Sequence, residues 1–87
     1  MEDLASSLSC LLDFHMTMIS DVARHDPELH GAVDLLSSSM EMVKRGKGFV
    51  TVQYHVSRVH AFGHGDKELD LHLSFLTELV HVFHKCI

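Results

Sequence analysis

Histidine is the residue type in this chain that is best suited to chemistry. The 87 residues include nine histidines, and with the histidines neutral the formal net charge is -5 at pH 7. Imidazole binds transition metals, and its charge changes between about pH 5 and 8. Protonation of all nine would move the formal charge from -5 to +4. The composition therefore predicts, as one interpretation, a histidine-based protein that responds to metal or to pH.

Four histidines in the second half of the chain are candidates for a surface zinc site. They are His60, His64, His81 and His84. His60 and His64 have the four-residue spacing that suits two ligands on one helical face, although Gly63 and Gly65 place His64 beyond a helix end. Zinc is the only cofactor that the sequence suggests.

Two further histidines differ from the rest in their surroundings. His15 lies within the apolar arc of the first predicted helix, where an imidazole needs a hydrogen-bond partner or a metal. From Asp70 onward, His72 is the one polar residue of the last predicted helix that falls outside its polar arc. We expect His15 to be a satisfied core histidine, with a ligand or pH-sensing role as the alternative.

Catalytic patterns are missing, and we expect the protein not to be an enzyme. Glu78 and His81 have the Glu-x-x-His spacing of di-iron bundles, but the necessary second copy of this motif is absent. Cys10 and Cys86 lie in no activating turn and are too few for a disulfide framework. A bridge between them is conceivable if the chain ends meet.

The basic residues form one small cluster, which is a candidate nucleic-acid site. It comprises Lys44, Arg45 and Lys47, with Arg58 as a further member. The acidic net charge opposes binding to phosphates, and cations at a helix C-terminus are favoured by the helix dipole alone. Nucleic-acid binding is therefore the weakest of the functional hypotheses.

The periodicity of apolar residues predicts an all-α protein, a small up-down four-helix bundle that forms a single domain over residues 1–87. Helices are expected at about 4–24, 27–45, 49–62 and 67–86. Asp26, Pro27 and Asp66 mark helix starts, and Gly46 marks an end. On the first helix, one broad apolar face is expected, formed by Leu4, Leu8, Leu11, Leu12, Met16, Met18, Ile19 and Val22.

Residues 49–62 are ambiguous. Val50, Val52, Tyr54 and Val56 alternate with polar residues as in a half-buried strand. Because the neighbouring segments read as helices, a helix is the simpler interpretation, and the alternative is a strand that pairs within a dimer.

The chain has more apolar side chains than four main helical stripes would bury. The surplus consists of Leu35, Met42, Phe62, Leu71, Phe75 and Val82. Exposed apolar patches usually mark interfaces, so these residues predict a protein–protein interaction module with a protein partner, in the first instance a homodimer. A viral or phage accessory protein or inhibitor would fit this description. With no stretch resembling a signal peptide or a membrane span, we expect a cytoplasmic protein without a membrane partner.

Overall fold

The computed structural model describes residues 3–86, which form four α-helices. These are α1 (Leu4–Val22), α2 (Pro27–Lys44), α3 (Phe49–Phe62) and α4 (Lys67–Cys86). The predicted all-α bundle is confirmed, and the bounds of α3 and α4 agree with those expected. The first helix ends at Val22 and the second at Lys44, because Ala23 and Arg45 occupy the C-cap positions.

Three of the helices have an aspartate side chain that caps the N-terminus. Asp3 accepts a hydrogen bond from the backbone N–H of Ala5, and Asp26 accepts from those of Glu28 and Leu29. Asp66 accepts from the N–H of Leu69. These carboxylates satisfy N–H groups that have no partner within the helix, which explains why Asp26 and Asp66 predicted the starts of α2 and α4.

Residues Phe49–Phe62 form one continuous helix, and the described part of the chain contains no strand. The strand alternative is therefore wrong. Val52 and Val59, seven residues apart, are both buried in the core, a spacing that places them on the same side of a helix. Burial of this stripe against the other helices outweighs the modest β preference of the valines.

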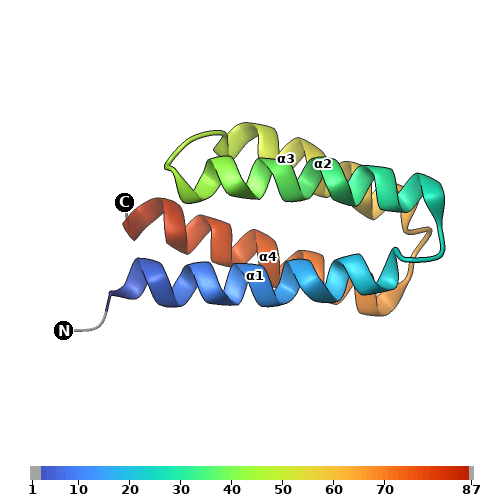
Figure 1. Ribbon diagram of the computed structural model, residues 1–87, viewed down its shortest axis with the longest axis horizontal. Coiled ribbons are helices and arrows are strands. Elements are labelled where there is room, and N and C mark those ends of the chain that lie inside the picture. The colour runs from blue at the N-terminus through green and yellow to red at the C-terminus, as the bar shows by residue number, and fades with distance from the viewer. Residues whose placement is uncertain (1–2, 87) are drawn as a thin grey trace.

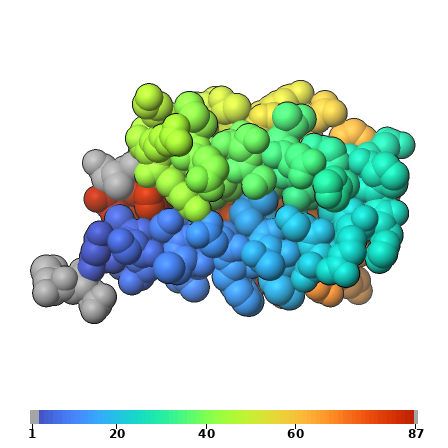
Figure 2. Space-filling view, viewed as in Figure 1, coloured from blue at the N-terminus to red at the C-terminus, as the bar shows by residue number. Residues whose placement is uncertain are grey.

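The four helices are arranged as two closely packed pairs. α1 packs mainly against α4 and α2 against α3, whereas contacts between the pairs are fewer. Figure 1 shows the α1/α4 pair in the lower half of the molecule and the α2/α3 pair in the upper half. The bundle measures 41 × 20 × 16 Å. In the space-filling view, α1 and α2 lie side by side along its length (Figure 2). Each pair therefore has an outer face that points away from the other pair.

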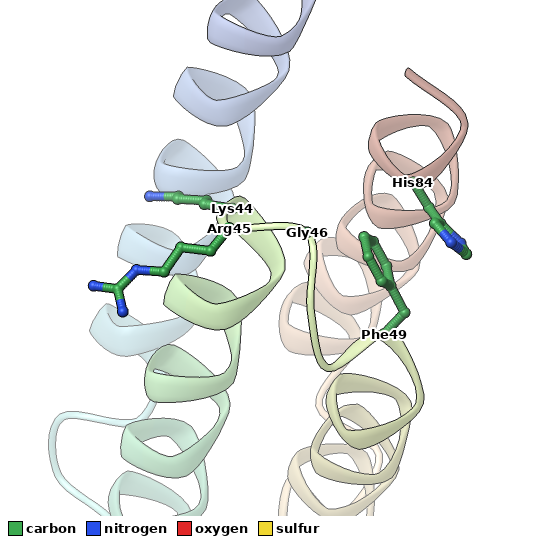
Figure 3. Close-up of a pocket in the computed structure, with 5 residues that line it drawn as sticks. All are labelled: Lys44, Arg45, Gly46, Phe49 and His84. Carbon is green, nitrogen blue, oxygen red and sulfur yellow. The ribbon is translucent and has the colours of Figure 1, made fainter. Parts of the chain in front are cut away.

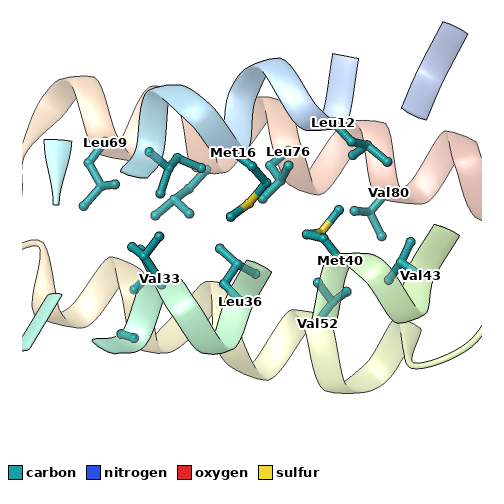
Figure 4. Packing of buried hydrophobic residues seen from close by; sticks show 14 of the residues in the cluster. Leu12, Met16, Val33, Leu36, Met40, Val43, Val52, Leu69, Leu76 and Val80 are labelled. Atoms are coloured by element: carbon teal, nitrogen blue, oxygen red, sulfur yellow. The ribbon is translucent and has the colours of Figure 1, made fainter. Parts of the chain in front are cut away.

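The core is apolar and is supplied by all four helices. Its fully buried side chains include Leu12 and Ile19 of α1, Leu36 of α2, Val59 of α3 and Leu76 of α4. Figure 4 shows side chains from the two helix pairs meeting in this layer. On α1, the predicted apolar face is too broad, because Leu4 and Leu11 are exposed. They lie at the edge of the helical arc that faces the core.

Candidate functional site

Most of the exposed large apolar side chains lie on one helix pair. Among the described residues, six of the ten such side chains belong to α1 and α4, namely Leu4, Leu11, Phe14, Leu71, Phe75 and Val82. We call this set the α1/α4 face. The other four, Leu35, Met42, Val50 and Tyr54, belong to α2 and α3.

Helical spacing and ring contacts place the members of the α1/α4 face on one surface. Leu4 and Leu11 are seven residues apart, as are Phe75 and Val82, so each pair lies on one side of its helix. Phe14 of α1 contacts the ring of His72 edge-on, with ring centroids 6.5 Å apart. Aromatic contacts therefore join the two stripes.

A pair of histidines lies within this aromatic cluster. The Nδ1 atom of His15 is 2.9 Å from the Nδ1 atom of His72, a hydrogen bond between α1 and α4. The ring of Phe75 stacks on that of His15 at 5.3 Å, and Phe14 meets His15 edge-on at 5.1 Å. Both histidines are half-buried. The pairing satisfies the predicted need of His15 for a polar partner.

The surroundings of His15 favour its neutral form. Burial lowers the pKa of His15 below its ordinary value of 6.5, and the nearby charge of a protonated His72 lowers it further. A neutral imidazole can donate one hydrogen bond and accept another. The pair can therefore share one proton between the two Nδ1 atoms, as the 2.9 Å separation requires.

The predicted interface residues divide between the two helix pairs. Leu71, Phe75 and Val82 lie together on the α1/α4 face, whereas Leu35 and Met42 are exposed on α2. The structure does not bring all six together.

Phe62 does not belong with the exposed residues, because it is half-buried and packs against the core. The guanidinium of Arg58 lies over its ring, 5.2 Å from the centroid. Phe62 is therefore less exposed than the other five residues of the predicted surplus, all of which are exposed.

Three members of the α1/α4 face were missed as surface residues. The sequence predicts Leu4 and Leu11 on the apolar face of the first helix, and its periodicity gives no prediction for Phe14. The sequence feature that could have identified them is the width of the apolar arc on α1. This arc is wider than the part of α1 that its two neighbours, α4 and α2, cover.

The four candidate zinc ligands do not form a cluster. The Nδ1 atom of His60 is 2.8 Å from a carboxylate oxygen of Asp70, and the ring of His84 stacks on Phe49 at 3.9 Å. His81 lines an open hollow with His84, whereas His64 lies in the turn after α3. Within residues 3–86, no group of three or more histidine, cysteine or acidic side chains is placed to hold a metal ion.

Two cations of the basic cluster, Lys44 and Arg45, lie together at the end of α2, whereas Arg58 lies within α3. Lys44 of α2 forms ion pairs with Asp13 of α1 and with Glu41. Burial alone would lower the pKa of Lys44, but the hydrogen bonds and charges of these two carboxylates raise it above 10.5 overall. Arg58 lies nine residues, roughly 14 Å, along α3 from its first residue.

An open hollow of about 680 Å³ lies at this end of the bundle, lined by Lys44, Arg45, Gly46, Phe49 and His84. Figure 3 shows the side chains of Lys44 and Arg45 directed away from the rings of Phe49 and His84. Because the Lys44 amine is already paired with two carboxylates, this geometry gives no support to a phosphate site.

Two remaining features of the described residues are the cysteines and the hydropathy of the helices. Cys10 and Cys86 are both exposed and free. None of the described helices combines the length and apolar character needed to cross a bilayer. No protein-family model, no curated protein and no solved structure matches this chain.

Proposed function

We propose that the protein is a small helical interaction module that docks the α1/α4 face onto another protein and acts by binding rather than by catalysis. The observation that carries this proposal is that six exposed apolar side chains share one face of the bundle. Ring contacts of Phe14 and Phe75 with the histidine pair join the α1 and α4 parts of this face. An accessory protein or inhibitor that works by covering a partner's surface would require only such a face.

The size of the α1/α4 face fits a docking surface. An aromatic side chain can bury on the order of 150–250 Å² and a leucine or valine about 60–120 Å², and the six members are each about half exposed, from 44% for Val82 to 56% for Leu4. Together they present roughly 300–500 Å² of apolar surface. The largest apolar patch on a typical monomer covers about 300–600 Å² and is often functional.

The aromatic members are suited to anchoring a partner. Phe14 and Phe75 are large, and their ring contacts with His15 hold them in fixed orientations. Rigid aromatic side chains lose little conformational entropy on binding and are frequent at the centres of interfaces. The ring cluster would therefore contribute most of the binding energy.

Two substitutions with similar exposure test the proposal. Phe75 on α4 is 48% exposed and Leu35 on α2 is 53% exposed, so aspartate at either position faces solvent in the monomer. We expect Phe75→Asp to weaken binding at least about tenfold, because a carboxylate would lose its water in the interface. Leu35→Asp should bind as the unchanged chain does.

Two measurements are made on the tagged full-length chain. The first is capture of binding proteins from a nuclease-treated lysate. The second is sedimentation of the purified chain over a concentration series, which measures self-association. Circular dichroism confirms that each variant retains its helices, and Leu71→Asp replaces Phe75→Asp if the latter unfolds. Binding that is lost with Leu35→Asp but retained with Phe75→Asp would contradict the assignment of the face. Absence of both self-association and bound protein would contradict the function itself.

A further inference from the structure

We infer that His15 and His72 form half of a zinc site, and that a second copy of this chain, docked on the α1/α4 face, supplies the other half. The resulting dimer would hold one ion between four imidazoles. This inference rests on the proposed function only in requiring that the α1/α4 face binds a protein. The inference identifies that protein as a second copy of this chain and places a zinc ion in the interface between the two copies.

The two imidazoles are already close to the geometry that zinc requires. Zinc binds histidine nitrogens at about 2.0–2.1 Å in tetrahedral sites, which places two such nitrogens about 3.3 Å apart. The Nδ1 atoms of His15 and His72 are 2.9 Å apart. To admit the ion, the two atoms must separate by about 0.4 Å, and each ring must turn so that its Nδ1 lone pair points at the ion and not at the other nitrogen. When both neutral rings carry their proton on Nε2, both Nδ1 lone pairs are free to bind metal.

The surrounding aromatic rings keep the two ligands oriented. Phe75 stacks on His15 with an angle of 24° between the ring planes. Phe14 meets the rings of both histidines edge-on, at 5.1 Å and 6.5 Å. Ligands that are held in place before the metal arrives lose less freedom on binding.

Two ligands are too few for a closed zinc site, and the chain does not provide the rest nearby. Zinc sites of the structural kind have four protein ligands. Within the described residues, no third histidine, cysteine or acidic side chain joins His15 and His72 in a possible metal group. The missing ligands must therefore come from another molecule.

A second copy can supply them through a simple symmetry. A two-fold axis parallel to the long axis of the bundle would keep each residue of the face at the same height along the bundle in both copies. α1 would then face the partner's α4 in antiparallel orientation, and the two histidine pairs would meet across the axis. Such an isologous contact is the commonest kind in soluble oligomers.

The area of the face supplies about half of what this occupant needs. A stable dimer of standard size buries about 800 Å² on each partner, and the six apolar side chains present roughly 300–500 Å². The residues beside them, including the half-buried His15 and His72, would add to the buried area. The apolar side chains alone are thus too small for a stable dimer of standard size, and a shared ion would supply further binding energy.

Sedimentation velocity and native mass spectrometry of the metal-stripped full-length chain, titrated with zinc chloride, test the inference. We expect zinc to convert the chain to a dimer that holds one ion per two chains. His15→Gln or His72→Gln should raise the zinc concentration needed for dimerisation at least about 100-fold, since losing even a hydrogen-bonding partner of a ligand commonly costs 10–100-fold in metal affinity. The matched control His81→Gln/His84→Gln should dimerise as the unchanged chain does.

Three results would overturn the zinc inference. In the first, zinc binds, but the chain stays monomeric or the binding is unaffected by His15→Gln and His72→Gln. In the second, a dimer forms equally without zinc and in His72→Gln, but not in Phe75→Asp, which leaves the proposed function intact and removes the metal. In the third, the chain is monomeric with and without zinc while a different protein still binds in a Phe75-dependent manner, which removes the second copy alone.

Discussion

Gly63, at the C-cap of α3, lies directly against Leu69 in the first turns of α4. A Cβ atom placed on Gly63 would be only 2.3 Å from Cδ2 of Leu69 and 3.3 Å from the carbonyl oxygen of Val59. Leu69 is fully buried, so its methyl group has little room to move. The turn between α3 and α4 can therefore be tight because the C-cap residue of α3 has no side chain.

Gly63→Ala is expected to destabilise the protein by about 1–3 kcal/mol, the usual cost of inserting an atom into a packed core. Gly31→Ala is the matched control. Gly31 lies inside α2, and a Cβ there meets nothing within 4 Å, so alanine should stabilise the helix by about 0.5–1 kcal/mol. Urea unfolding of both variants measures the difference. Equal stability of Gly63→Ala and the unchanged chain would show that Leu69 repacks freely.

Adjacent leucines of α2 should differ strongly in their contribution to stability. Leu36 is fully buried and Leu35 is 53% exposed. Leu36→Ala would leave a cavity and lower the free energy of unfolding by about 2–5 kcal/mol, whereas Leu35→Ala should change it by less than about 0.5 kcal/mol. Thermal and urea unfolding of the two variants provide the test. A large loss in Leu35→Ala would mean that this residue belongs to the core.

The hydrogen bond between His15 and His72 should appear as an energetic coupling in metal-free protein. Removing either imidazole leaves the other without its hydrogen-bond partner, so each single alanine variant loses the same hydrogen bond. The double variant loses that hydrogen bond only once. A double-mutant cycle should therefore give a coupling of about 0.5–1.5 kcal/mol. Urea unfolding in the presence of a chelator measures this coupling. Strict additivity would mean that the two rings do not interact in solution.

The ion pairs of Lys44 should make stability depend on alkaline pH. The pKa of Lys44 in the folded protein is raised above its ordinary value of 10.5 by Asp13 and Glu41. The contribution of the charged amine is therefore fully present below pH 10.5 and is lost as the pH rises through the folded-state pKa. Because both carboxylates are more than half exposed, the contribution should be at most about 1 kcal/mol.

Lys44→Met, compared with Lys85→Met, isolates this contribution. The free energy of unfolding of Lys44→Met should fall below that of Lys85→Met near neutral pH, and the two should converge at strongly alkaline pH. A difference that persists at all pH values would assign the effect to packing of the Lys44 side chain instead.

The helices could be predicted closely because their signals are local. Asp26 followed by Pro27 starts α2, Asp66 starts α4, and apolar residues at helical spacing identify the faces that enter the core. The ambiguity at 49–62 was also local, because valine and tyrosine fit a strand as well as a short helix. Only the burial of Val52 and Val59 against other helices resolves it.

The candidate site could be predicted only in part, because it depends on which helices pack together. Phe75, Leu71 and Val82 were expected at a surface, but nothing in their own segment links them to Phe14 or Leu11 of α1. Similarly, His15 needed a partner, and the sequence offered eight other histidines. The closest partner is His72, because α1 packs against α4 along its length.

The sequence by itself determined the class of fold, the positions of the turns and the surplus of apolar side chains, since capping, helical periodicity and composition act over a few residues. Tertiary structure alone decided that α1 pairs with α4, that Leu35 and Phe75 lie on different helix pairs, and that two histidines 57 residues apart share a hydrogen bond. The physical reason is that a helix with a broad apolar arc can pack in several ways. Which part of the arc is buried depends on the neighbours that fill the core, and the part left over becomes the surface available to a partner.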